Sequence, residues 1–248
     1  MADCILPRRR ARLRHARRAL LFRAERKPRR RPCRGSRGRA EPTPLEERSF
    51  EDGEFKLRPL ASVRGRTAFV YQSLAGTDEM PAAERIIRLL FLLGNLRDAG
   101  AERRIAVVPY LAYARKDRRT TTRDPVYTRY IAELLEAVGT DRLIALDVHS
   151  PPALDNAFRI PVDHLSAVPM MADHFARRFG DADIVVVSPD VGGVKRVQLF
   201  KELLDRRLGR GVDVVFIEKR RSGGVVSGGT IVGASSFRQP RSRSPSVR

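Results

Sequence analysis

The chain has 248 residues, of which 42% are apolar, and this is enough to form a hydrophobic core. Its formal net charge of +20 lies almost entirely at the two ends, because residues 1–40 contain 16 Lys or Arg against two acidic residues, and residues 234–248 contain four Arg and no acidic residue. Residues 41–233 are close to neutral at +2, so the charge does not indicate a folded nucleic-acid-binding domain. No apolar run is long enough to cross a membrane, and the two cysteines lack the spacing of a metal site or a disulfide framework.

Residues 1–44 are rich in arginine, and we expect them to form a disordered basic tail. A nucleic-acid-binding arm, a transit peptide and an out-of-frame translation product are alternative explanations of this composition. From residue 45 onward, short apolar strands alternate with amphipathic helices. The expected strands are residues 68–72, 104–109, 143–147, 184–188 and 213–217. The expected helices are residues 81–99, 127–138, 167–179 and 194–208.

This alternation predicts the α/β class, with a doubly wound parallel sheet covered on both faces. Strands such as IVVVS and VDVVFI are apolar at nearly every position, which is typical of strands buried on both sides. In such sheets ligands bind beyond the carboxyl ends of the strands. We therefore expect the functional residues directly after each strand.

The first unusual segment follows the strand expected to end at residue 109. It reads PYLAYARKDRR and combines Tyr110 and Tyr113 with Arg115, Lys116 and Asp117. Aromatic rings can stack on a purine and guanidinium groups can pair with phosphate oxygens, so the segment is typical of a nucleotide-binding loop. A solvated charged turn would explain the arginines but not the two tyrosines.

Two further strand ends carry potential ligands for a metal or a phosphate. The segment LDVHS places Asp147 and His149 at a strand end, where His149 could bind a divalent metal or a triphosphate or could be structural. The segment IVVVSPDVGG precedes a helix, and Gly192 and Gly193 would let backbone amides approach a phosphate. Asp190 in the same segment could hold magnesium or a sugar hydroxyl.

The last candidate segment, EKRRSGGVVSGGT, follows the strand expected at residues 213–217. Lys219 and Arg221 belong to three adjacent cations, which are followed by a run rich in glycine and serine. Cations on a mobile loop are suited to closing over a polyphosphate during its transfer. A surface hairpin is the alternative.

In combination and in this order, the four segments resemble the ribose-phosphate diphosphokinase family, also called phosphoribosyl pyrophosphate synthetases. The resemblance begins at FEDGEFKLRP, residues 50–59, and extends to about residue 233. It implies two phosphoribosyltransferase-like domains, at residues 45–163 and 164–233, followed by a basic tail at residues 234–248. It also implies a cytoplasmic, magnesium-dependent enzyme that transfers the diphosphoryl group of ATP to ribose 5-phosphate.

The resemblance assigns roles to individual residues. The implied ATP-binding residues are Asp52, Gly53, Glu54, Arg115, Lys116, Asp117 and His149. The implied magnesium ligands are His149 and Asp190, and the implied substrate-binding residues are Asp190, Gly192, Gly193 and Arg221. Lys219 and Arg221 are implied to be catalytic. Asp52, Gly53 and Glu54 match a loop that reaches the ATP of a neighbouring subunit, so a homo-oligomer or a hetero-oligomer with a paralogue is expected.

The sequence departs from the family pattern at three places. The family commonly has Gln at the position of Lys116, which alters the adenine contact. The family's opening LFALN is replaced by LFRAE around residue 23, and the acidic loop that holds the 5-phosphate of ribose does not follow residue 233. We therefore expect an incomplete second domain and impaired activity. Out-of-frame translation would explain both ends, and resequencing the locus would test this hypothesis.

Other functions stay open from the sequence. A non-catalytic nucleotide-binding subunit would share the ATP-side residues, although Lys219 and Arg221 favour catalysis. A nucleic-acid-binding protein would act through residues 1–40, with a steep dependence on salt. A phosphoribosyltransferase fits less well, because it would need the acidic loop and would not need FEDGE or YARKDR.

Overall fold

The structure is a computed structural model that describes residues 19–23, 42–189, 193–222 and 225–233. It divides into two compact units, Met1–Leu165 and Ser166–Arg248. The division falls two residues after the expected boundary, because strand β7 (Val162–Leu165) completes the sheet of the first unit. Within the described ranges no helix is long and apolar enough to cross a membrane.

The first unit is built on a five-stranded parallel sheet in the order β1-β4-β5-β6-β7. This arrangement confirms the predicted α/β fold with a parallel sheet. In β4 and β5 every second side chain is buried, and these are small or β-branched residues that suit a covered sheet. The strands other than β7 are β1 (Ala19–Arg23), β4 (Thr67–Tyr71), β5 (Arg103–Val108) and β6 (Arg142–Leu146).

Helices α2 (Ala82–Asp98) and α3 (Tyr127–Ala137) cover the sheet with apolar side chains spaced three and four residues apart. This spacing places the side chains on one face of each helix. In α2 the fully buried residues are Leu89, Leu92, Leu93 and Leu96, and in α3 the buried residues are Thr128, Ile131, Ala132 and Leu135. Both helices were predicted to within one residue at each end.

Strand β1 is a correction to the tail expected at residues 1–44. Residues 19–23 pair in parallel with β4, and the Phe22 side chain is fully buried in the core. Thr43 donates its amide to the Leu21 carbonyl oxygen at 2.5 Å, so residues near 42 also return to this strand. The apolar run is short and lies among arginines, which is why composition did not reveal it. The other residues of the expected tail up to residue 41 lie outside the described ranges.

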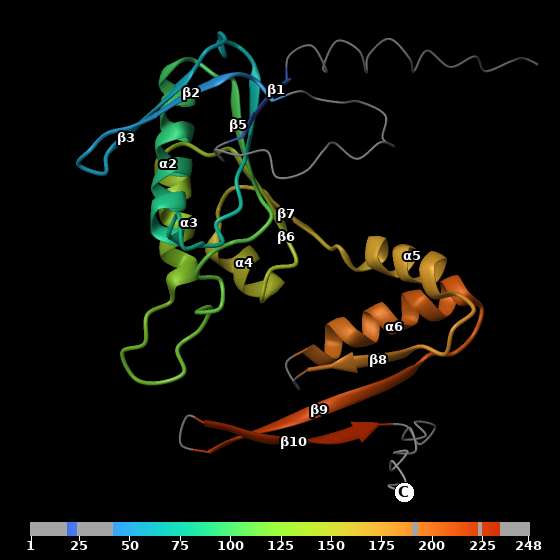
Figure 1. Ribbon diagram of the computed structural model, residues 1–248. Coiled ribbons are helices and arrows are strands. Elements are labelled where there is room, and N and C mark those ends of the chain that lie inside the picture. The colour runs from blue at the N-terminus through green and yellow to red at the C-terminus, as the bar shows by residue number, and fades with distance from the viewer. Residues whose placement is uncertain (1–18, 24–41, 190–192, 223–224, 234–248) are drawn as a thin grey trace, which may run out of the picture. The chain divides into compact units, whose positions relative to one another are not determined.

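A two-stranded antiparallel hairpin, β2 (Leu45–Ser49) and β3 (Phe55–Pro59), lies beside α2 (Figure 1). Its anchor is Arg88 of α2, whose side chain is only 3% exposed. The Arg88 guanidinium pairs with Glu84 at 2.8 Å and with Glu47 of β2, and it lies 4.4 Å from the centre of the Phe55 ring. One buried cation therefore connects both strands of the hairpin to the helix.

The second unit has a three-stranded sheet in the order β10-β9-β8. Strands β8 (Val185–Ser188) and β9 (Asp213–Ser222) are parallel, whereas β10 (Val225–Gly233) runs antiparallel to β9. The described residues of this segment, 218–222 and 225–230, therefore form paired strands, as the surface-hairpin alternative predicted. Figure 1 shows helices α5 (Val168–Phe179) and α6 (Val194–Leu208) packed together beside β8.

Strand β1 provides a first test of the structure. We expect Phe22→Ala to lower the free energy of unfolding by about 3–5 kcal/mol, because it removes a fully buried aromatic side chain. Denaturant unfolding followed by circular dichroism measures this change. Leu60→Ala, at a side chain that is 55% exposed, is the matched control and should change stability little. An equally small effect of Phe22→Ala would show that β1 does not belong to the core.

Arg88 provides a second test. We expect Arg88→Ala to cost about 3–5 kcal/mol of stability, because Glu47 and Glu84 would both lose their ion pair with the buried guanidinium. Arg88→Met combined with Glu47→Gln and Glu84→Gln should recover most of this loss, since no unpaired carboxylate then exists. If the triple variant were as unstable as Arg88→Ala, the cost would lie in packing and not in charge.

Candidate functional site

The candidate site lies at the carboxyl edge of the first sheet. Strands β5 and β6 are adjacent and parallel, with Val108 paired to Ala145 near their ends. The segments that follow them, the β5 loop (residues 109–126) and the β6 turn (residues 147–150), therefore emerge at the same edge. The segment after β4 joins them, because Leu74 donates its amide to the Tyr110 carbonyl oxygen at 3.0 Å.

The β5 loop begins with a strained tyrosine. Tyr113 has a positive φ of 61°, a conformation that is unfavourable for residues other than glycine and that is typical of functional sites. Its ring lies edge-on against Tyr127 at 5.5 Å between centroids, and Tyr127 lies in the same way against Tyr130 at 6.1 Å. The three rings are each between 39% and 47% exposed, so their faces are accessible.

The charged residues of the β5 loop differ in how they are engaged. Arg115 is exposed, and within the described ranges no hydrogen bond or ion pair holds its guanidinium. Lys116 is engaged, because its Nζ lies 3.1 Å from Oδ2 of Asp124. Arg115 is therefore a cation free to meet an anion, whereas Lys116 already has one.

Asp124 closes the β5 loop. Its Oδ2 accepts hydrogen bonds from the Thr120 hydroxyl at 2.5 Å, the Thr120 amide at 3.1 Å, the Thr121 amide at 3.2 Å and the Lys116 ammonium. The Thr120 hydroxyl bond, and then the Thr120 amide and Lys116, hold the pKa of the Asp124 carboxyl far below its ordinary value. No role was predicted for Asp124, although an Asp-Pro pair shortly before an expected helix is a signal for a side chain that binds nearby amides.

The β6 turn is also strained and tightly held. Asp147 has a positive φ of 44°, and its amide donates to the Leu165 carbonyl oxygen at 2.9 Å. The Val148 amide donates to Nε2 of His164 at 3.2 Å, so His164 fixes the backbone between Asp147 and His149. The His149 side chain is exposed, and only Ser150 separates this residue from the short helix α4 (Pro151–Ala157).

A hollow of about 780 Å³ lies mainly between α3 and α4 and includes residues of the β5 loop and the β6 turn, although Arg115 and His149 do not line it. Asp117 and Arg118 line it from the loop, and Ser150 lines it from the turn, next to His149. Helices α3 and α4 form its other walls, where Glu133 is paired with Arg129 at 2.8 Å. The volume lies within the range of small-molecule sites, about 300–1,000 Å³.

The donor set suits a magnesium ion that arrives with its ligand. In the described part of the chain, no group of three or more His, Cys, Asp or Glu side chains could hold a metal. His149, with Asp147 two residues earlier, provides only a sparse set. Magnesium keeps several waters and is often bound through substrate phosphates together with one or two protein groups, so this set fits a metal carried by a polyphosphate.

The predicted residues Asp52, Gly53 and Glu54 form the tip of the β2–β3 hairpin. All three are exposed, Gly53 has a φ of 88°, and the Glu54 amide donates to Oδ1 of Asp52 at 3.0 Å. The positive φ explains the glycine, because this conformation is costly for other residues. The tip thus presents two carboxylates on a stiff turn anchored by Arg88.

The predicted residues of the second unit are only partly described. Gly193 lies directly before α6, and Asp190 and Gly192 are outside the described residues. Lys219 and Arg221 lie in β9, where their backbones pair with Gly229 and Val226 of β10. Their backbone therefore has the paired form that the surface-hairpin alternative predicted.

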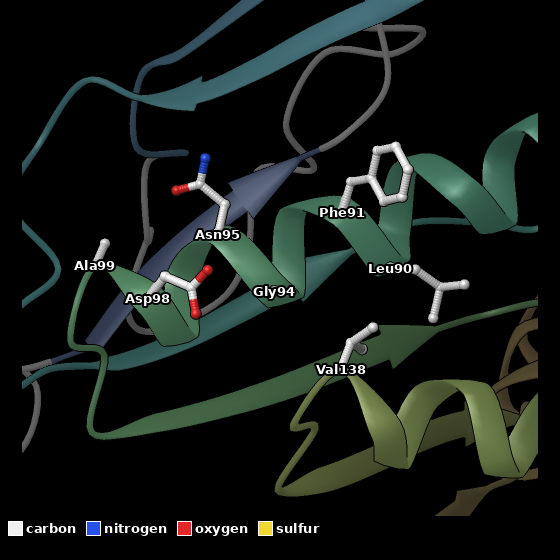
Figure 2. A pocket seen from close by; sticks show the side chains of 7 residues that line it. All are labelled: Leu90, Phe91, Gly94, Asn95, Asp98, Ala99 and Val138. Carbon is white, nitrogen blue, oxygen red and sulfur yellow. The ribbon is translucent and has the colours of Figure 1, made fainter.

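A second hollow, of about 500 Å³, opens on the outer face of α2. Figure 2 shows Phe91, Asn95 and Asp98 of α2 around it, with Val138 opposite. It lies at the carboxyl end of α2, close to where β5 begins, and is thus at the amino edge of the sheet. None of the predicted site residues lines it, so it is a weaker candidate than the hollow between the two loops.

Comparisons with known proteins show which proteins the chain resembles in sequence. Residues 36–139 match the family model described as the N-terminal domain of ribose phosphate pyrophosphokinase. Ribose-phosphate pyrophosphokinase 1 of Streptococcus pneumoniae is 38% identical over 176 residues, which are 71% of this chain and 51% of the relative. Ribose-phosphate pyrophosphokinase of Fusobacterium nucleatum is 39% identical over 173 residues, which are 69% of this chain and 51% of the relative.

The solved structures provide a further comparison. Phosphoribosylpyrophosphate synthetase from Mycobacterium smegmatis superimposes with a TM-score of 0.68 at 29% identity, covering 87% of this chain and 67% of that chain. The chain spans about half the length of the curated relatives it matches. The resemblance inferred from the sequence motifs is confirmed.

The Asp124 carboxylate provides a pH test of this site. Its pKa is lower in the folded state than in the unfolded chain, so its stabilisation of the loop is complete above the unfolded value of about 4 and is lost as the pH falls through the lowered pKa. We expect the Thr120 and Thr121 amide shifts in NMR spectra to stay constant from about pH 8 to about pH 4 and to move together only below it. Asp124→Asn should abolish this acidic transition, and a wild-type transition above about pH 4 would contradict the closed loop.

Proposed function

We propose that this chain, which is similar to ribose-phosphate pyrophosphokinases in sequence and fold, acts in the transfer of the diphosphoryl group of ATP to ribose 5-phosphate. The products are phosphoribosyl pyrophosphate, a precursor in nucleotide biosynthesis, and AMP. We place the reaction in the cytoplasm, since the scarcity of cysteine, with only Cys4 and Cys33, indicates no dependence on an oxidising compartment.

One observation carries the ATP-binding part of the proposal. The hollow between the β5 loop and the β6 turn brings Asp117 and Ser150 together, with Arg115 and His149 in the same two segments. Arg115 is an exposed guanidinium without a protein partner among the described residues, which suits a phosphate oxygen. The exposed rings of Tyr110 and Tyr113 are available to stack on a purine.

In the proposed reaction, the anomeric hydroxyl of ribose 5-phosphate attacks the β-phosphorus of ATP. The bond breaks between the β-phosphorus and the oxygen that bridges the α- and β-phosphorus, and AMP leaves with that oxygen. The hydroxyl proton passes to solvent or a base. Bound magnesium would neutralise phosphate charge, with His149 as its proposed ligand on the ATP side and Asp190 as its proposed ligand on the ribose 5-phosphate side. Arg115 would orient the triphosphate, and Lys219 and Arg221 would stabilise the charge that develops on the oxygens around the β-phosphorus.

The hairpin tip supports an oligomeric form of the proposal. Asp52 and Glu54 are exposed on a turn that Arg88 anchors to α2, so they point away from the core on a firmly held support. We propose that this tip contacts the nucleotide site of a neighbouring subunit, either a second copy or a paralogue.

A separate part of the proposal concerns Gly192 and Gly193, which precede α6 in the sequence. Their backbone amides would receive a substrate phosphate.

Binding of Mg·ATP tests the first half of this proposal. We expect the chain to bind Mg·ATP in isothermal titration calorimetry and Arg115→Ala to weaken binding at least about tenfold, because a charged hydrogen bond is lost. Arg97→Ala is the matched control, since Arg97 is exposed on α2 and pairs only weakly with Asp98. If the wild-type chain bound Mg·ATP no more tightly than the Arg115→Ala variant, the assigned site would be wrong.

Release of AMP tests the second half. With ATP, magnesium and ribose 5-phosphate, we expect AMP to form at an impaired rate, because the acidic loop of the family does not follow residue 233. We expect Lys219→Ala to reduce this rate by at least about a hundredfold, because the cation acts on the transition state. Tight Mg·ATP binding without any AMP release by the chain alone would favour the non-catalytic subunit instead.

A further inference from the structure

We propose that Asp124 is a positioning residue of the β5 loop and that Lys116 serves as its counter-ion instead of contacting the nucleotide. This inference rests on the proposed function, because it assigns to Arg115 alone the charged contact expected from the pair Arg115–Lys116. It concerns how the site of the first unit is kept in shape.

The side chain of Asp124 gathers four donors on a single oxygen. Oδ2 accepts from Lys116 Nζ at 3.1 Å, from both the amide and the hydroxyl of Thr120, and from the Thr121 amide. The backbone adds two bonds, since the Asp124 amide donates to the Thr121 carbonyl oxygen at 3.2 Å and Arg119 Nε donates to the Asp124 carbonyl oxygen at 3.3 Å. Residues 116–124 therefore form a closed ring around one carboxylate.

The backbone of Lys116 is held from the other side. Thr128, which is 3% exposed in the first turn of α3, donates its hydroxyl to the Lys116 carbonyl oxygen at 3.3 Å. The Thr128 amide points to the same oxygen at 3.4 Å, and the Lys116 amide donates to the Tyr113 carbonyl oxygen at 3.2 Å. Both the main chain and the side chain of Lys116 are thus engaged within the loop. Arg115, the preceding residue, is fixed in place by them.

The charges of the ring lead to the same conclusion. Lys116 and Asp124 form a neutral pair, so Lys116 adds little net attraction for a triphosphate while it is held there. If Lys116 moved onto a phosphate, Asp124 would keep only three of its four donors. The negative charge of the Asp124 carboxylate would then be left without its counter-ion near the ligand. The geometry therefore favours Lys116 as part of the ring and Arg115 as the cation that binds.

An experiment without ligand tests whether the Asp124 carboxylate holds residues 116–124 together. In Asp124→Asn we expect hydrogen exchange of the Thr120 and Thr121 amides, and trypsin cleavage after Arg118 and Arg119, to be at least about tenfold faster than in the wild type. Asp98→Asn is the matched control, because Asp98 is 74% exposed and loses the same charge on α2, and it should leave both rates unchanged. Equal rates in Asp124→Asn and the wild type would overturn the proposal.

A double-mutant cycle with Mg·ATP tests the division of roles. We expect Asp124→Asn to weaken binding at least about fivefold and Lys116→Ala to weaken it less, because three of the four donors to Asp124 stay in place. The double variant should bind about as Asp124→Asn does, and Asp124→Glu, which keeps the carboxylate, should restore part of the affinity. If Lys116 contacts the nucleotide, Lys116→Ala has the larger effect and the two losses add, and this result overturns the proposal.

The outcomes separate this inference from the function on which it rests. A wild-type chain that bound no Mg·ATP would refute the proposed function and, with it, any nucleotide role for Asp124. Normal Mg·ATP binding with additive losses, or with no change in amide exchange, would refute the role of Asp124 alone.

Discussion

The parallel pairing of β5 with β6 is the constraint on which the site depends. Four consecutive residue pairs, from Ile105 with Arg142 to Val108 with Ala145, set the register of the two strands. This register is what brings two loops that are distant in sequence to one edge, where they share a hollow. A slip of one residue would exchange the buried and exposed faces of the strand, so the core and the site are fixed by the same hydrogen bonds.

A second constraint acts on the hairpin through Arg88. Burying a guanidinium is costly unless carboxylates surround it, and here Glu47 and Glu84 meet it from two different elements. Apolar side chains could hold the hairpin equally strongly, but they would allow it to slide. The directional ion pairs specify one position of the hairpin on α2, and they therefore specify where the exposed tip with Asp52 and Glu54 is presented.

Periodicity in the sequence predicted the long elements well. The helices α2, α3, α5 and α6 were each placed within one residue of their observed ends, because their apolar residues recur at helical spacing over several turns. The pattern failed where elements are short or half-exposed. Strand β7 and helix α4 have four and seven residues, and β1 is an apolar run of five residues among arginines, so none of them offers a period to detect.

The candidate site was predictable for a different reason. In parallel sheets ligands bind after the strands, so the loop of Arg115 and the turn of His149 could be named from strand ends alone. The partners of those residues could not be named. Lys116 meets Asp124 only because the chain folds back between them, and the hydrogen bond from Val148 to His164 joins two neighbouring strands. Such contacts depend on the three-dimensional path and leave no local signature.

The positive backbone angles at this edge have a consequence for how such a chain can evolve. Every described non-glycine residue with a left-handed backbone, namely Tyr113, Arg123 and Asp147, belongs to the β5 loop or the β6 turn. A glycine at any of them would relieve roughly 1 kcal/mol of strain and would be the easy route to a more robust protein. The same exchange would remove a ring, a guanidinium or a carboxylate from the edge. If these residues persist in variants selected for thermostability, the carboxyl edge of the sheet is still required for function. If they are replaced by glycine, the function of this edge is no longer under selection.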